Sequence, residues 1–411
     1  MKSLPSKRRA GQTKRGKGST AARLREEAGV IYAKKVEQVR SVPMFVPTDF
    51  PQALGLLFVS LVCWGSWGNS AKFSTLVFPQ FYLLYGTSLF LWSAILGFVL
   101  GGDYYTQDSM HRDFIHNLRN ATGDSILYAM ASGAIFNVSN SLLAILIGLV
   151  GLSVSFPICI GISLIAGTLL SYMVQPAHTN FTLLCIGLLL ALLALLCMAY
   201  AHHLKNSTPT TPDTDATYNE ETHLVVGDYQ PDTSSNAKTK TPLAFGRLIL
   251  LCILCGGLMG CFSPLSTLAQ DATRPGHLNP YTCIFFFTLS AMVTTLPLVY
   301  WLHHRPLDGV ASGQSFWHGF QAAATMDKVW PVLGGLIWSL GTLLNFVSGN
   351  KVSFAIAYAI GQAAPVAAAF WGLFYFKEFK GAPMLSFVFM GLMFVFYGSA
   401  VGFIASSSSV K

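Results

Sequence analysis

Neutral amide, indole and hydroxyl side chains are the groups in this chain that could bind a solute, because they interrupt long apolar runs. The set consists of Trp67, Asn137, Asn140, Trp338, Thr342, Asn345, Tyr358 and Gln362. Amides donate and accept hydrogen bonds, and aromatic planes stack on flat rings. Together these groups predict a substrate-binding site for an uncharged solute that is flat or hydroxylated. The alternative for each single residue is packing, because Asn, Gln, Ser and Gly also join neighbouring membrane helices.

Gln362 stands three positions before Pro365, in an apolar run that is long enough to cross a bilayer. An amide and a helix-breaking Pro at membrane depth are tolerated where the freed groups face protein or a wet cavity. We therefore expect Gln362 to face a central cavity together with Asn140 and Thr342, with Trp338 in the cavity wall.

Charged side chains are scarce in the apolar runs. Asp271 ends one run and Glu378 ends another, near the membrane boundary, where charged side chains can reach water. Coupling of transport to protons requires titratable groups along the path. Asp271 and Glu378 are the candidates for that role, and facilitated diffusion without a coupling ion is the alternative.

The residues that would support an enzyme do not assemble into a site. No Ser/His/Asp set, cluster of metal ligands or pair of carboxylates can be recognised, so we predict neither catalysis nor a cofactor. Cys252 and Cys255 form a C-x-x-C pair, but they stand in an apolar helix without a second pair or a His. The glycines from Gly11 to Gly18 resemble a phosphate-binding loop without its Ser or Thr. Neither nucleotide nor nucleic-acid binding is predicted.

The composition identifies a membrane protein. Hydrophobic residues make up 52% of the 411 residues and charged residues 11%, which is far from the composition of soluble domains. Residues 1–50 contain twelve Lys or Arg and four Asp or Glu, which accounts for the whole net charge of +8. This basic tail is suited to contact with anionic lipid headgroups.

Ten apolar runs are about as long as a membrane-spanning helix, which needs on the order of 20 residues. They lie near 51–71, 79–101, 126–149, 153–174, 181–202, 244–268, 280–302, 331–349, 352–376 and 383–404. The basic tail 1–50 and the linker 203–243, rich in Pro, Thr, Asp and Ser, are expected to be disordered, and 405–411 is a C-terminal tail. The linker separates five spans (51–202) from five (244–404). An odd number of spans per half gives the halves opposite orientations, so we predict an all-α polytopic membrane protein of two inverted five-helix repeats.

A sequence echo supports a duplication. The run from Gly334 to Thr342 has its counterpart from Ser132 to Asn140, 202 positions earlier. The tripeptide that begins at Val352 recurs at Val154, where the offset is 198. The change of offset predicts a short insertion between the halves.

The orientation follows from the basic tail. Positive residues favour the cytoplasmic side, so both termini are predicted to lie on the cytoplasmic side of the membrane, which is a plasma membrane or an endomembrane. The glycosylation triplet at Asn206 then lies on the opposite side.

At these residues the chain resembles the ureide permease family, a branch of the drug/metabolite transporter superfamily. The motifs are Ser139-Asn140, Gly151-Leu152-Ser153-Val154, Gly167-Thr168 with Tyr172, Phe262-Ser263-Pro264 with Leu268-Ala269, Tyr281-Thr282 with Phe285-Phe286, and Gln362, Pro365, Phe370-Trp371-Gly372 and Glu378. The resemblance covers about 350 residues and all ten spans. It implies a ten-helix permease that moves allantoin, uracil, xanthine or related heterocycles with protons.

The sequence therefore predicts a secondary transporter of small neutral solutes, with nitrogenous heterocycles as the leading class. A sugar is the alternative substrate, because bacterial sugar porters of the same superfamily share the core pattern. A membrane scaffold or receptor without transport is the alternative from another class. An amide-lined centre argues against that reading, since a scaffold does not need one.

Overall fold

The computed structural model describes residues 44–102, 113–176, 179–207, 245–305 and 315–408. These residues are nearly all helical: α2 (Phe50–Ser66), α3 (Asn69–Lys72), α4 (Phe78–Leu100), α5 (Phe114–Asn120), α6 (Gly123–Val150), α7 (Leu152–Ser155), η1 (Phe156–Ile160), α8 (Gly161–Val174), α9 (Phe181–Ser207), α11 (Phe245–Ala269), α12 (Pro280–His304), α13 (Phe316–Ala322), α14 (Thr325–Val352), α15 (Phe354–Gly361), α16 (Ala364–Phe370), η2 (Trp371–Tyr375) and α17 (Met384–Ser406). The segments η1 and η2 are single π-helical turns.

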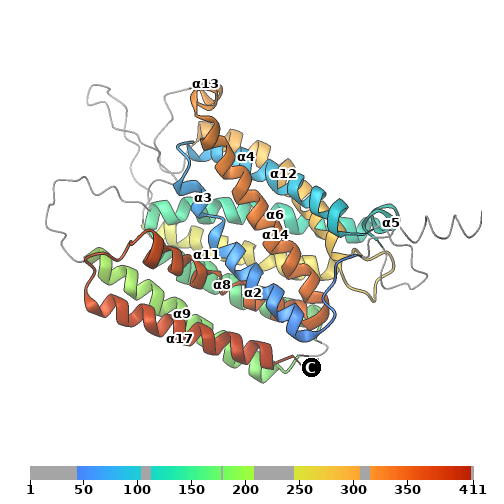
Figure 1. The fold of residues 1–411 in the computed structure, drawn as a ribbon. Coiled ribbons are helices and arrows are strands. Elements are labelled where there is room, and N and C mark those ends of the chain that lie inside the picture. Colours follow the sequence, from blue (N-terminus) through green and yellow to red (C-terminus); the bar gives the residue numbers. More distant parts are fainter. Residues whose placement is uncertain (1–43, 103–112, 177–178, 208–244, 306–314, 409–411) are drawn as a thin grey trace, which may run out of the picture.

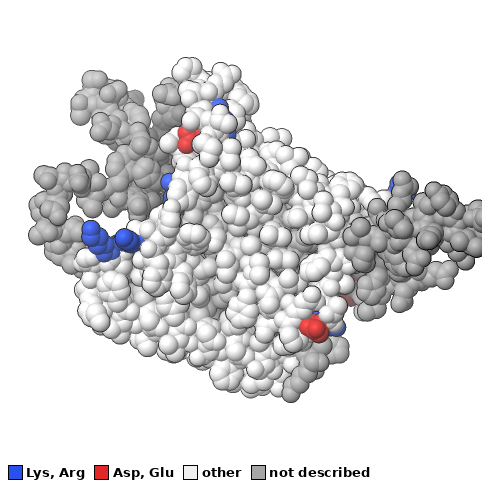
Figure 2. Space-filling model, viewed as in Figure 1, with Lys and Arg blue, Asp and Glu red and all other residues white. Residues whose placement is uncertain are grey.

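Ten helical stretches in the described residues are long and apolar enough to cross a membrane, which confirms the predicted number of spans. The chain is a multi-pass integral membrane protein. On the face shown in Figure 2, the charged side chains of the described residues lie toward its ends, and the wide area between them is uncharged. Such a surface suits contact with the hydrocarbon of a bilayer.

Local sequence explains where helices begin. The carboxylate of Asp49 accepts a hydrogen bond from Gln52 N at 2.8 Å and caps α2, which has Pro51 in its first turn. The amide of Asn279 caps α12 in the same way, with Pro280 as the first helical residue. Both helices use a polar cap followed by Pro, whose missing N–H costs nothing in the first turn.

Two boundaries differ from the sequence prediction. The eighth span, predicted to begin near 331, starts at Thr325, because polar residues outside the apolar window continue the helix. There Asp327 accepts a hydrogen bond from the Thr75 hydroxyl at 2.9 Å. The predicted linker begins too early, since α9 continues to Ser207. Most of the predicted tail and the rest of the linker lie outside the described residues.

Helix boundaries recur at a constant spacing. Helices α6 and α14 begin at Gly123 and Thr325 and end at Val150 and Val352, which are 202 positions apart at both ends. Helices α5 and α13 repeat with the same spacing at both ends, and α4 and α12 at their first residues. The two halves of the chain therefore share one frame through at least three consecutive elements.

The insertion is not found at the place where the tripeptide copy put it. Ser353, at φ 121°, follows α14 where Gly151, at φ 76°, follows α6, so the spacing is still 202 at this turn. Val154, the start of the tripeptide copy, lies inside the next helix, α7. The tripeptide match is therefore not the structural correspondence. The turn itself is the repeated feature, and a positive φ at a residue other than Gly is uncommon.

The spans of the two halves are interleaved. Helix α2 packs on α14 and α11 packs on α6, which is the same pairing with the halves exchanged. Helix α4 packs on α12, α8 on α15, and α9 on α17, and Figure 1 shows the last pair side by side along the lower edge. All of these contacts join one half to the other, so the core lies between the halves.

Candidate functional site

A cavity of about 230 Å³ lies between the halves. Its lining comes from α2, α3, α6, η1 and α9 of the first half and from α11, α14, α16 and η2 of the second, with residues that adjoin these elements. It includes Trp338 near the middle of its span, and it continues to Lys72, His202 and Glu378 near the ends of theirs. The cavity therefore extends from the middle of the membrane toward one face.

Hydrogen bonds join the halves at the opposite end of the spans. The backbone N–H of Asn180 donates to Ser407 O at 2.7 Å, and the Thr179 hydroxyl donates to Ser353 Oγ at 3.2 Å. Each of these residues lies next to the opposite end of a span from the end that carries the cavity's charged residues. These contacts hold the two halves together at that face.

Aromatic planes form the deep part of the cavity. Trp338 is 3% exposed, and its ring lies 4.5 Å from that of Phe136 and 5.8 Å from that of Phe287. Phe136 and Trp338 are equivalent in the repeat, so two equivalent residues meet between the halves. Trp67 stacks on Tyr85 at 4.6 Å, which fixes the plane of its indole.

A second indole, that of Trp64, is held by a hydrogen bond. Its Nε1–H donates to Thr342 Oγ1 at 3.0 Å, and Trp64 lines the cavity while Thr342 does not. Thr342 therefore orients an aromatic side chain of the cavity instead of facing it, which corrects the expectation from the sequence. The reason is that a larger side chain from the neighbouring span occupies the space in front of it.

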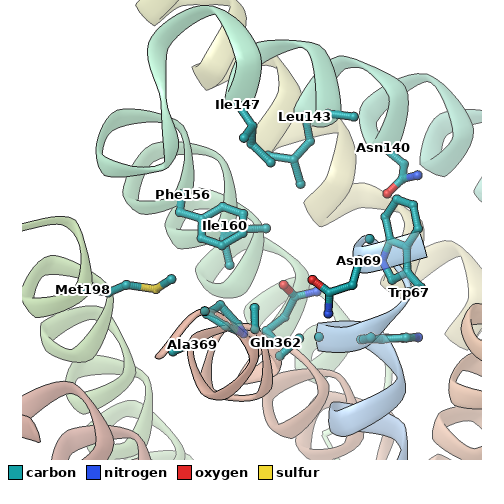
Figure 3. A pocket seen from close by; sticks show the side chains of 18 of the residues that line it. Trp67, Asn69, Asn140, Leu143, Ile147, Phe156, Ile160, Met198, Gln362 and Ala369 are labelled. Atoms are coloured by element: carbon teal, nitrogen blue, oxygen red, sulfur yellow. The ribbon is translucent and has the colours of Figure 1, made fainter. Parts of the chain in front are cut away.

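Three amides project into the cavity. Asn140 Nδ2 donates to the Tyr82 hydroxyl at 3.3 Å, and Figure 3 shows the Asn140 oxygen on the cavity side. Gln362 follows the last residue of α15, and within the described chain its side-chain amide has no hydrogen-bond partner. Asn69 Nδ2 is buried and also lacks a partner among the described residues. The cavity thus holds amide groups with unused hydrogen-bonding capacity.

The position of Gln362 follows from a break in the ninth span. Helix α15 ends at Gly361, and α16 begins at Ala364 with Pro365 in its first turn. Pro365 has no N–H to continue the ladder, so the chain turns at Gln362 and Ala363. The interrupted helix that the sequence predicted is present and lies against the cavity.

Charged and titratable residues gather at one end of the cavity. Lys72, the last residue of α3, forms an ion pair with Glu378, which follows η2. His202 of α9 lines the same end, and its ring packs edge-on against Phe379 at 5.0 Å. Sequence reasoning selected Glu378 as a site residue and did not select Lys72, His202, Asn69 or Trp64. Lys72 carried a signal, because it is the only charged residue between positions 50 and 102.

The remaining predicted residues have packing contacts. Asn137 accepts from the Tyr82 hydroxyl and donates to Thr294 Oγ1 at 3.0 Å. Asn345 Nδ2 donates to Ala357 O at 2.8 Å, which ties α14 to α15. None of these residues lines the cavity.

Tyr358 and Asp271 also lie outside the cavity lining. The Tyr358 hydroxyl is 2.6 Å from Ser163 Oγ and joins α15 to α8. Asp271 follows α11 and pairs with Arg274, with its Oδ2 3.5 Å from Arg274 Nε. Of the two proton-coupling candidates, the cavity therefore contains Glu378 and not Asp271.

The spans and the cavity define a class of membrane protein. A helical bundle whose solute-sized cavity begins at mid-membrane and extends toward one face is typical of a transporter. A family model described as ureide permease matches residues 81–242 and 239–407, and the chain therefore belongs to the ureide permease family. This confirms the family resemblance, and membership identifies the chain as a transporter and not an enzyme.

Curated relatives align over most of their length. Ureide permease 4 of Arabidopsis thaliana is 24% identical, and the alignment covers 89% of this chain and 99% of the relative. Ureide permease 5 of Arabidopsis thaliana is 26% identical, with 87% and 95% covered. Probable ureide permease A3 of Vigna unguiculata is 24% identical, with 82% and 98% covered.

A solved structure described only as "Crystal structure of protein" covers 85% of this chain and is itself covered over 96%. The TM-score is 0.50 and the sequence identity is 13%, so this likeness concerns the fold alone.

Proposed function

We propose that this chain is a secondary transporter that moves ureides such as allantoin, and related flat nitrogenous heterocycles, across a membrane. The observation that carries the proposal is a single cavity that combines two kinds of group: the amides of Asn69 and Gln362, for which the described residues provide no hydrogen-bond partner to Asn69 Nδ2 or to the Gln362 side chain, and the indole planes of Trp67 and Trp338. Ureides present alternating carbonyl and N–H groups on a flat frame. Amides pair with both kinds of group, and indoles cover the ring face.

The size of the cavity supports a small solute. Its volume of about 230 Å³ is below the roughly 300–1,000 Å³ of drug-sized pockets. The substrate-contacting residues in the proposal are Trp67, Asn69, Asn140, Trp338 and Gln362. The other predicted residues, which pack outside the lining, act on the site only through their neighbours.

The proposal includes the architecture that transport requires. The halves 51–202 and 244–404 are inverted repeats, in keeping with the drug/metabolite transporter superfamily, and they alternate access to a site between them. The matched helix bounds and the exchange-symmetric packing support this division. With the N-terminal tail in the cytoplasm, the charged end of the cavity faces the opposite side. Protons are the proposed coupling ion, and Glu378 is the carboxylate available to them inside the cavity.

The test is uptake of labelled allantoin, uracil and glucose by vesicles that contain the purified chain, with and without a pH gradient. We expect saturable uptake of allantoin and of uracil, and each of the two, when unlabelled, should inhibit uptake of the other. Both should accumulate more strongly when a pH gradient is imposed. Vesicles without protein are the control. Uptake of glucose alone would support the sugar alternative, and uptake of none would support a scaffold or receptor. Uptake of the heterocycles that does not depend on the pH gradient would contradict proton coupling and support facilitated diffusion.

A further inference from the structure

The ion pair of Lys72 and Glu378 is a contact between the two halves inside the cavity. Lys72 ends α3 in the first half, and Glu378 follows η2 in the second. Their side chains are 21% and 12% exposed. Exposed ion pairs contribute little, but both partners of this pair are largely removed from water and line the solute cavity.

The backbone around Gly372 leaves room for the Glu378 carboxylate. A Cβ atom at Gly372 would lie 2.8 Å from Glu378 Oε2, so a residue with a side chain would displace the carboxylate. The backbone N–H of Glu378 donates to Gly372 O at 2.8 Å, across the π-helical turn η2. The preceding residue, Lys377, has φ 54° and turns the chain back toward the cavity.

Lys72 is held by a second contact as well. Its Nζ lies 4.0 Å from the centre of the Phe376 ring, in addition to its bond with Glu378. A cation over an aromatic face is attracted by the ring electrons. Each member of the pair is therefore also held in place by contacts outside the pair, so the pair has a defined position in the cavity wall.

We propose that this internal ion pair determines specificity: it cancels the charge of the cavity and thereby selects uncharged ureides. The inference rests on the proposed function. In a cavity lined mostly by apolar side chains, a charged solute would need an opposite charge to replace its lost water. Lys72 and Glu378 already neutralise each other, so neither is free to pair with a charge on the solute. An uncharged solute uses the amides and indoles and leaves the pair intact.

Removing one partner should therefore change which solutes bind. Glu378→Gln leaves the Lys72 cation without its counter-ion, and a carboxylate on the solute can take that place. Lys72→Gln leaves the Glu378 carboxylate unpaired, which favours a solute that carries a cation. Combining both substitutions removes both charges and should restore the preference for uncharged solutes.

The experiment measures competition against labelled allantoin in vesicles. The competitor is allantoate, the ring-opened form, which carries the same ureido groups beside a carboxylate. For Glu378→Gln we expect the inhibition constant of allantoate to fall by about tenfold to a hundredfold relative to wild type. The double variant should return to the wild-type value. Asp271→Asn is the matched control, because it also removes the carboxylate of an ion pair, the one with Arg274, but Asp271 lies outside the cavity lining.

The outcomes separate the two proposals. If the wild type takes up allantoin but the inhibition constant of allantoate is the same in Glu378→Gln as in the wild type, the role of the ion pair is overturned. The proposed function then remains intact. If the wild type carries no ureide, the proposed function fails and this inference fails with it. If Glu378→Gln does not accumulate as folded protein, Lys72→Gln decides the question. It should become sensitive to a cationic guanidine analogue of the ureide, and insensitivity would overturn the inference.

Discussion

Equivalent positions in the two halves have the same backbone frame and different chemistry. Asn140 and Thr342 are 202 positions apart, yet Asn140 lines the cavity while Thr342 accepts a hydrogen bond from Trp64. Ile160 and Gln362 also correspond, and both line the cavity, one with an apolar side chain and one with an amide. In the helices that share the spacing of 202, the bounds correspond between the halves. Each half then sets its own contribution to the site.

The largest effect should come from the two glycines that correspond at positions 133 and 335. A Cβ at Gly133 would lie 1.9 Å from Phe287 O, which is backbone of α12. A Cβ at Gly335 would lie 1.8 Å from Ser88 Oγ, which is a side chain that can rotate. Gly133→Ala should therefore destabilise the protein by about 3 kcal/mol, and Gly335→Ala by about 1 kcal/mol.

Thermal unfolding and the yield of monodisperse protein in detergent measure this difference. Adding Ser88→Ala to Gly335→Ala should recover most of the loss, because it removes the Oγ atom in conflict and keeps a good helix former in α4. Equal losses for Gly133→Ala and Gly335→Ala would show that backbone contact is not what distinguishes the two halves.

The second prediction compares an amide in the cavity with an amide in the packing. Gln362→Ala should weaken ureide affinity by about tenfold to a hundredfold, since it leaves solute groups unpaired at a cost of about 1–3 kcal/mol. Folded protein should hardly change, because Gln362 joins no helices among the described residues. Asn345→Ala is the matched control, and it should lower folded protein because Ala357 O loses its partner.

Uptake kinetics and the yield of folded protein read these two effects separately. Loss of folded protein in Gln362→Ala, with unchanged affinity in the molecules that survive, would make Gln362 a packing residue and contradict the site.

The smallest effect concerns Tyr358, whose equivalent in the first half is Phe156. Tyr358→Phe removes the hydrogen bond with Ser163 and should cost about 1 kcal/mol of stability, with uptake unchanged. Ser163→Ala in the Tyr358→Phe background should add little, since the shared bond is already gone. A clear loss of uptake at normal stability would instead place Tyr358 in the transport path.

Much of the fold could be predicted because it depends on features that are local in sequence. Apolar runs of bilayer length located all ten spans, and Pro365 located the break next to Gln362. The start of the eighth span was missed because residues such as Asp327 are polar and still helical. Their helix is stabilised by contacts with the first half, which a hydropathy window does not contain.

The site was predicted only in part, because the direction of a side chain depends on its neighbours in space. Asn137 and Asn140 are less than one turn apart on α6, but Asn140 lines the cavity and Asn137 is enclosed by Tyr82 and Thr294. Nothing in the sequence of α6 distinguishes these two amides. Lys72 was missed for the opposite reason, since its importance comes from Glu378, more than 300 positions away.

The interleaving of the spans has a consequence for the synthesis and membrane insertion of the chain. The faces that α2, α4 and α9 present to α14, α12 and α17 have no partner until the second half has been synthesised. When only five spans have been made, polar side chains such as that of Asn137, which donates to Thr294 of α12, still lack their partners in the second half. Until the tenth span has been inserted, such a nascent chain depends on the insertion machinery, or on transient partners, to keep these polar side chains away from lipid.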